Sequence, residues 1–348
     1  MYNDTSLQLQ ALSYLWQMRF LWLFFLFTSF PPYQSFHKFT ISGKAQGTTY
    51  NMTYYASDSI VTQYQVDSLL GKIDSSLSIY KPYSLISRFN NAETGITIDD
   101  HLKTVVERSI AVCRDTKGIF DITILPVVQA WGFGTRPIDS LPDKNTLRQL
   151  KKCVGSKYLG ISGNKLIKSK PCVQIDVNGI AQGYTVDELA GLLESNGIKN
   201  YIVELGGEIR VRGRKRPGNE KMRIGIEAPA GDEFASNGMQ HVLELDSGAI
   251  TTSGSYRKYY ENQGKKITHI IDARTAYPVH NELISVTVYA KDAIIADAYD
   301  NALMVMGLKK ALNFTEQRND IAAHFIYRNE KGVVADTASS RFYKLFRH

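Results

Sequence analysis

Cysteine is scarce in this sequence, and the few cysteines exclude the common cysteine-based metal sites. Cys113, Cys153 and Cys172 are the only three among 348 residues, and none has the spacing of a zinc site. If the chain is exported, Cys153 and Cys172 could pair because they flank one predicted hairpin. The sequence cannot supply the geometry on which pairing depends. Cys113 lies among apolar helical residues, which predicts a buried thiol.

A long hydrophobic run is also missing from the N-terminal region. The apolar stretch at residues 20–27 follows Arg19 and is shorter than the roughly 20 residues that span a bilayer. Such a stretch is typical of the core of a secretory signal, and Met18 is an alternative start. No cysteine comes shortly after this stretch, so a lipid anchor on cysteine is excluded. An uncleaved anchor from Ala11 onward is the alternative.

The chain is therefore expected to contain one targeting segment and one functional domain. Residues 1–37 are predicted to be a signal peptide or an N-terminal membrane anchor, and residues 38–348 the domain. A hydrophobic content of 43% is enough for a sizeable core. Internal repeats and low-complexity segments are lacking.

A nucleic-acid-binding module is lacking, although the formal net charge is +7. Much of the excess is local, in residues 210–216 and in the C-terminal tail. Without a recognisable module, a basic loop is best interpreted as solvated charge. Attraction to an anionic membrane surface or to an acidic partner is a second interpretation. We expect no nucleic-acid partner.

The chain is organised around residues 173–213. Alternating apolar residues predict a strand at 173–177, and Asn178-Gly179 forms a turn before a helix that ends at Asn196-Gly197. A second strand follows at residues 201–204. Free N–H groups at the helix start could face an anion. An ordinary βαβ unit with turn glycines explains this pattern equally well.

The remaining pattern contains more strands than simple βα alternation would need. This excess favours an α+β fold with mixed, largely antiparallel sheets and packed helices. Residues 78–90 are predicted to form a loop with an exposed Tyr80. Helices are expected at 59–77, 100–115, 144–153 and 293–306. Strands are expected at 39–41, 49–55, 158–161, 165–167, 223–226, 241–245, 284–289 and 324–327.

Three oxygen-bearing side chains share one face of the last predicted helix. Asp297, Asp300 and Asn301 are spaced i, i+3 and i+4. Oxygen ligands in this arrangement suit a hard cation. The alternative is a solvated acidic helix start, favoured by the helix dipole.

Several short motifs also occur in a fixed order. Together they resemble the ApbE family, the FAD:protein FMN transferases, over about residues 40–345. Agreement among several ordered motifs is a much stronger signal than any one of them. The motifs lie at residues 46–48, 78–80, 86–90, 120–123, 131–134, 176–187, 205–209, 252–254, 269–275 and 296–303.

The resemblance implies a T-fold-like architecture and Mg²⁺-dependent transfer of FMN from FAD to a threonine hydroxyl of an acceptor flavoprotein, with release of AMP. The magnesium ligands would be the Gly179 carbonyl, Asp297, Asp300 and Asn301, and His269 resembles the catalytic position. The FAD contacts would be Tyr80, Asp121, Ile122, Thr123, Asp176, Gln182 and Ile271.

Other interpretations of these residues remain open. His269 could be a structural histidine in a strand, Tyr80 a loop tyrosine and Asp176 a turn cap. His101 and His241 lie outside the motifs and are interpreted as structural. The sequence also departs from the family pattern, with Gln182 for Lys, Ala273 for Pro, Ala276 for Gly and Asn301 for Thr.

Three functions compete at this point. The first is FMN transfer to flavoprotein subunits of membrane redox complexes, by an exported protein on the periplasmic side of the bacterial inner membrane. The second is hydrolysis of FAD to FMN and AMP by a pyrophosphatase. The third is flavin binding without turnover. FAD is the small-molecule partner in all three, and membrane association would come from the N-terminal segment.

Overall fold

The computed structural model describes residues 35–226, 241–255, 259–262 and 265–346. The chain from His37 to His348 forms one compact unit. The predicted signal or anchor segment lies almost wholly outside the described residues. Among the helices described, none has the length and apolar character needed to cross a membrane.

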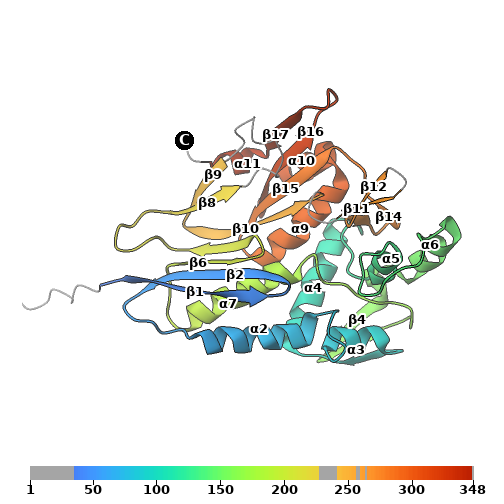
Figure 1. Ribbon diagram of the computed structural model, residues 1–348, viewed down its shortest axis with the longest axis horizontal. Helices are drawn as coiled ribbons and strands as arrows, with labels where there is room; N and C mark the ends of the chain where they lie inside the picture. Colours follow the sequence, from blue (N-terminus) through green and yellow to red (C-terminus); the bar gives the residue numbers. More distant parts are fainter. Residues whose placement is uncertain (1–34, 227–240, 256–258, 263–264, 347–348) are drawn as a thin grey trace, which may run out of the picture. The chain divides into compact units, whose positions relative to one another are not determined.

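An eight-stranded sheet is the centre of the fold (Figure 1). Every neighbouring pair in it is antiparallel, which confirms the predicted α+β class. In spatial order the strands are β1 (His37–Ala45), β2 (Thr48–Ala56), β6 (Tyr201–Leu205), β7 (Glu208–Arg212), β10 (Ser247–Gly254), β15 (Leu283–Ala290), β16 (Ile321–Arg328) and β17 (Val334–Ala338).

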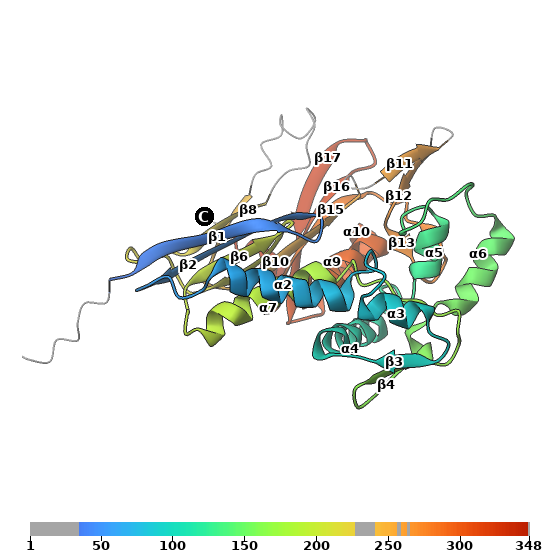
Figure 2. The same cartoon turned by 60° about the horizontal axis from the view of Figure 1, so that its bottom comes forward.

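Smaller sheets lie around this one. One of them has three strands, and Figure 2 shows its strands β3 and β4 beside α3 and α4. The strands are β3 (Gly95–Thr97), β4 (Leu159–Ser162) and β5 (Lys165–Lys168), and the two-stranded pairs are β8 (Met222–Ile226) with β9 (His241–Leu245), β11 (Tyr259–Asn262) with β12 (Lys265–Thr268), and β13 (Ile271–Asp272) with β14 (Tyr277–Pro278).

Helices cover the sheet and build the remainder of the domain. Their starts follow from capping residues: Thr62 and Gln65 form a capping box, and Asp99 accepts a hydrogen bond from Leu102 N. The helices are α2 (Gln63–Leu77), α3 (Leu85–Asn91), α4 (Asp100–Asp115), α5 (Leu125–Ala130), α6 (Lys144–Leu150), α7 (Ala181–Ser195), α9 (Ala293–Met306), α10 (Leu308–Glu316) and α11 (Ser340–Tyr343).

Buried and more exposed residues alternate along much of β2, and this alternation explains how one end of the sheet is covered. Tyr50, Met52 and Tyr54 are buried on one face, as expected for a strand that is apolar on one side. They pack in one cluster with Val66 of α2 and Leu189 of α7. Both figures show these two helices on the same side of β1 and β2.

The helix α9 is buried against the other half of the sheet. It packs on β10 and β15, and it also contacts α7 and α4. Leu303 and Ala298 share a core cluster with Phe325 and Ala323 of β16. Because α9 is surrounded on several sides, side chains on its polar face are held inside the molecule.

Three sequence predictions about local structure are wrong. The segment 173–177 is not a strand, since only an isolated bridge between Ile124 and Gln174 occurs there. The predicted loop 78–90 contains α3, capped by Ser84. The helix predicted at 59–77 begins only at Gln63. For residues 173–177 tertiary contacts outweigh the local pattern, whereas α3 and α2 begin where Ser84 and Thr62 cap them.

The two cysteines in question do form a disulfide. Cys153 and Cys172 are bonded, with Cα atoms 5.5 Å apart, which is ordinary disulfide geometry. The third cysteine, predicted to be buried, is only partly so, and its Sγ donates a hydrogen bond to Asp121 Oδ2 at 3.4 Å.

Candidate functional site

One pocket collects nearly all the residues that the sequence singles out. Its walls come from the segment before α5, the start of α7, the end of β10, the segment around β13, and α9. Its volume is about 280 Å³, near the lower end of the usual range for ligand pockets. The predicted residues that line it are Tyr80, Asp121, Ile122, Asp176, Gly179, Gln182, His269, Ile271, Asp297, Asp300 and Asn301.

Thr123 is the one predicted site residue that does not line the pocket. It is fully buried, and its backbone N–H and hydroxyl donate hydrogen bonds to Asp121 Oδ1 at 2.9 and 2.7 Å. Ser156 donates to both Asp121 oxygens at 2.7 and 2.8 Å. Thr123 therefore holds Asp121 in place, and its predicted direct contact with FAD stays a prediction.

Three of the four oxygen atoms predicted to bind a metal lie around Asn301 Nδ2, the amide nitrogen of the fourth predicted ligand. Asn301 Nδ2 lies 2.9 Å from Asp300 Oδ1, 3.4 Å from the Gly179 carbonyl and 3.5 Å from Asp297 Oδ1. These oxygens come from two segments of the chain that are 122 residues apart. A cluster of carboxylate and carbonyl oxygens fits Mg²⁺, which prefers hard oxygen ligands.

The two aspartates are buried, in contrast to a solvated acidic helix start. Asp297 is 4% exposed and Asp300 is 1% exposed. The backbone N–H of Gly183 donates to Asp297 Oδ2 at 2.8 Å. The negative charge of a buried carboxylate must be balanced by hydrogen-bond donors or by a cation. The burial of both aspartates therefore favours a cation site over a solvated helix face.

The helix α9 is anchored at its start by a buried charge network. Asp187 Oδ1 and Oδ2 accept hydrogen bonds from the N–H groups of Ala293 and Ile294, both at 2.9 Å. Arg210 pairs with Asp187 and, at 3.1 Å, with Asp292. Burial raises the pKa of Asp187, and the Arg210 guanidinium opposes that shift. Asp187 thus orients α9 without lining the pocket.

The rim of the pocket is built by the turn at residues 176–179. Asp176 Oδ1 accepts a hydrogen bond from Asn178 N at 2.8 Å, which is the turn-capping role considered for it. Asn178 Nδ2 lies 3.4 Å from Tyr80 OH. Tyr80 is 59% exposed, so its ring face is available for stacking on an aromatic ligand.

His269 lies between β12 and β13 and lines the pocket, so the interpretation as a strand histidine is wrong. Its ring meets Phe133 edge to face, with centroids 6.3 Å apart. The following turn is closed by Asp272, whose carboxylate accepts three hydrogen bonds from Arg274. Trp131 Nε1 donates to Ala276 O at 2.9 Å and fixes the end of that turn.

Some lining residues were not assigned a role from the sequence. Ser253 Oγ donates to Asn301 Oδ1 at 3.3 Å and so orients the amide. Glu208, at 4% exposure, and Phe133 also face the pocket. All three lie within the family motifs, at residues 252–254, 205–209 and 131–134. Their positions in these motifs were therefore the signal that could have identified them.

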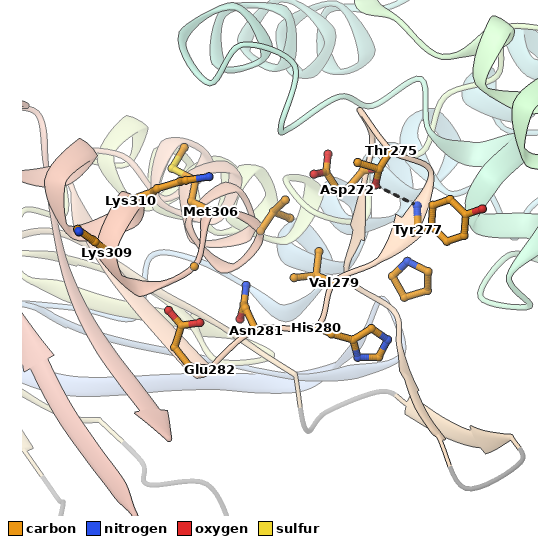
Figure 3. A pocket seen from close by; sticks show the side chains of 13 residues that line it. Asp272, Thr275, Tyr277, Val279, His280, Asn281, Glu282, Met306, Lys309 and Lys310 are labelled. Carbon is orange, nitrogen blue, oxygen red and sulfur yellow. Dashed lines mark hydrogen bonds between the residues drawn. The ribbon is translucent and has the colours of Figure 1, made fainter. Parts of the chain in front are cut away.

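A second hollow adjoins this pocket, and Val305 lines both. In Figure 3, Lys309, Lys310 and Glu282 lie on one side of the hollow, and Thr275 and Tyr277 lie on the other. The loop between these sides is held by Asn281 Nδ2, which donates to Met304 O at 2.8 Å. None of the predicted site residues lines this hollow.

Comparison with known families agrees with the motif pattern. The model of the ApbE family matches residues 46–325. An FAD:protein FMN transferase of Vibrio cholerae is 38% identical over 310 residues, covering 87% of this chain and 91% of that protein. One from Haemophilus influenzae is 35% identical over 320 residues, covering 88% and 91%.

Solved structures agree with the fold. The flavin transferase ApbE from Vibrio cholerae superposes with a TM-score of 0.79 at 34% identity, covering 89% of this chain and 99% of that one. The apo flavinyl transferase ApbE of Pseudomonas stutzeri gives a TM-score of 0.81 at 32% identity, covering 91% and 99%.

Proposed function

Since the chain belongs to the ApbE family, we propose that it is an FAD:protein FMN transferase. The observation that carries this proposal is the convergence of the ordered motifs on one pocket, with buried carboxylates on one side and His269 on another. A bare flavin-binding protein would not need buried acidic oxygens beside a diphosphate site. Hydrolysis of FAD to FMN and AMP uses the same groups and remains the alternative outcome of the test.

FAD is expected to bind with an aromatic ring near the rim and its diphosphate near α9. Tyr80 provides an exposed ring face, and Asp176 provides a carboxylate able to accept a hydrogen bond from a ring or ribose donor. Gln182, in the first turn of α7, replaces the family's lysine. A neutral amide can still donate to a phosphate oxygen, although without the charge assistance of an ammonium group.

Mg²⁺ fits the oxygen cluster of α9. Gly179 O, Asp297, Asp300 and Asn301 would hold it, and when bound it would neutralise charge on the diphosphate. Asn301 would present its amide oxygen to the ion, which requires its Nδ2 to turn away from Asp300. Amide rotamers related by such a flip differ little in shape.

The transfer step conserves atoms and charge. The oxygen of an acceptor threonine bonds to the phosphorus of the FMN half of FAD, and the bond from that phosphorus to the bridging oxygen breaks. AMP leaves with the bridging oxygen, and the hydroxyl proton passes to a base. His269 is the proposed base because it lines the pocket and a neutral imidazole accepts a proton near neutral pH.

One assay separates the three candidate functions. The protein is incubated with FAD, Mg²⁺ and a protein acceptor of the Vibrio cholerae relative, and products are followed by flavin fluorescence on a denaturing gel and by AMP release. Transfer gives a fluorescent acceptor band and equimolar AMP, and the band is lost when the acceptor threonine is replaced by alanine. Free FMN with AMP indicates hydrolysis, and unchanged FAD indicates binding only.

We also propose that the chain acts outside the cytoplasm, on flavoprotein subunits of membrane redox complexes. The Cys153–Cys172 disulfide supports an oxidising compartment, and the apolar run at residues 20–27 supports export. Fractionation of cells expressing the full chain tests this. Recovery in the cytoplasm with both cysteines reduced would refute export.

A further inference from the structure

A cluster of two histidines and one aspartate lies apart from the flavin pocket. Asp336 Oδ2 is 2.9 Å from His241 Nε2 and 2.9 Å from His324 Nε2. One donor atom from each residue lies within 4.8 Å of the others. None of the three lines the pocket beside α9, so the proposed transferase reaction makes no use of them.

The sheet places two of these side chains on the same face. In the antiparallel pair of β16 and β17, Ile326 faces Asp336 and His324 faces Ala338, so His324 and Asp336 are diagonal neighbours on one surface. Phe325 points the opposite way, into the core cluster that contains α9. The cluster therefore lies on the side of the sheet away from α9.

The third residue comes from a separate hairpin. His241 begins β9, which pairs with β8 and not with the large sheet. An isolated bridge between Leu243 and Phe346 links β9 to the C-terminal segment. Figure 1 shows β9 and α11 close together near β16 and β17. An ion bound by His241 together with His324 and Asp336 would therefore join this hairpin to the edge of the large sheet.

Aromatic packing fixes both imidazole rings. His324 is 1% exposed and stacks on Phe342 with centroids 5.8 Å apart. His241 stacks on Phe346 at 4.4 Å. The side chains of His241 and Asp336 are 34% and 30% exposed, so one side of the cluster remains open to solvent and to an incoming ion.

We propose that His241, His324 and Asp336 form a binding site for a divalent transition-metal ion, with Zn²⁺ preferred. The bound ion would join β9 to the edge of the large sheet. Two imidazole nitrogens and one carboxylate suit zinc and neighbouring metals, whereas Mg²⁺ and Ca²⁺ prefer an all-oxygen shell. Water from the exposed side completes the four ligands.

The outer shell of this site is incomplete, which limits its affinity. His324 Nδ1 is buried and has no hydrogen-bond partner in the described part of the chain. A zinc-bound histidine usually donates its second N–H to an acceptor, and loss of that partner weakens binding by about 10–100-fold. We therefore expect binding weaker than that of a fully supported zinc site.

The test is calorimetric titration of the EDTA-treated full chain with Zn²⁺ in the presence of millimolar Mg²⁺, which competes for the oxygen cluster of α9. We expect one equivalent of Zn²⁺ to bind and to raise the melting temperature. His241→Ala and Asp336→Asn each remove a ligand and should weaken binding by more than about 10-fold, the lower end of the loss seen when only an outer partner is removed. These two side chains are partly exposed, so both variants are expected to fold.

Two controls separate this site from others. His37→Ala removes an exposed histidine at the start of β1 and should leave Zn²⁺ binding unchanged. Asp297→Asn alters the α9 cluster and should also leave it unchanged. Absence of Zn²⁺ binding by the wild type, or equal binding by the wild type and both cluster variants, would overturn the proposal.

Discussion

The backbone N–H of Gly183 donates a hydrogen bond to Asp297 Oδ2 at 2.8 Å, and this contact joins the start of α7 to the face of α9 that carries the proposed metal ligands. The two helices are very close at this point. A Cβ atom on residue 183 would lie 2.4 Å from Ala293 O and 2.7 Å from Asp297 Cβ. The glycine is needed for helix approach, and the approach positions the carboxylate.

Gly183→Ala should therefore destabilise the protein and weaken magnesium use. Overpacking of this kind costs about 1–3 kcal/mol of unfolding free energy, measurable by urea denaturation. Gly191→Ala is the matched control, since residue 191 is in the same helix with nothing within 4 Å of an added Cβ. That change should stabilise by up to about 1 kcal/mol. Equal changes in unfolding free energy at residues 183 and 191 would contradict the close approach of α7 and α9.

Asp297→Asn should raise the Mg²⁺ concentration needed for half-maximal transfer by at least about 10-fold, because one anionic ligand is lost. The amide oxygen can still accept the Gly183 hydrogen bond, so most stability should be retained. Asn301→Thr, which introduces the family's usual residue, should be tolerated, and Asn301→Leu should impair magnesium use. Asp74→Asn, on α2, is the control. If transfer by Asp297→Asn depends on Mg²⁺ concentration as transfer by the wild type does, Asp297 is not a magnesium ligand.

His269→Ala should slow FMN transfer by about 100-fold or more, the usual size of a general-base contribution. FAD affinity should change little, because the imidazole is assigned to the acceptor proton and not to flavin binding. Transfer rate and FAD affinity are measured separately, with His37→Ala as the control. Loss of FAD affinity with an unchanged maximal rate would assign His269 to binding.

The Cys113 thiol should react slowly with iodoacetamide in the folded protein. Burial, with the nearby Asp121 carboxylate, raises its pKa to about 11. A thiol is neutral below its pKa, so the reactive thiolate forms only as the pH rises toward that value. At pH 8 labelling should be about 100-fold slower than in urea, with the disulfide kept intact. Equal rates would show an exposed thiol.

Ala276→Gly should have almost no effect on stability although residue 276 is fully buried. Its φ of 66° is in the left-handed region, which costs an L-residue about 1–2 kcal/mol. Relief of that strain offsets the lost methyl, worth about 0.8 kcal/mol, and the added chain entropy. Ala190→Gly, buried within α7, should instead cost about 2 kcal/mol. Similar losses at both sites would argue against strain at Ala276.

The sequence by itself determined those features that depend on neighbours along the chain. The i, i+3, i+4 spacing of Asp297, Asp300 and Asn301 places them on one helix face whatever the fold. Alternation in β2 likewise specifies which face of that strand is apolar. The ordered motifs identified the family, and with it the fold and most of the residues that line the pocket.

Tertiary structure alone decided which distant groups meet. It brought the Gly179 carbonyl to Asn301 and kept Thr123 out of the pocket lining. It also left residues 173–177 with only an isolated bridge to Ile124, although their pattern alternates. It assembled His241, His324 and Asp336 from three strands, and of these only His241 was named from the sequence, as a structural histidine. Such contacts depend on the packing of whole helices and sheets, which no local period encodes.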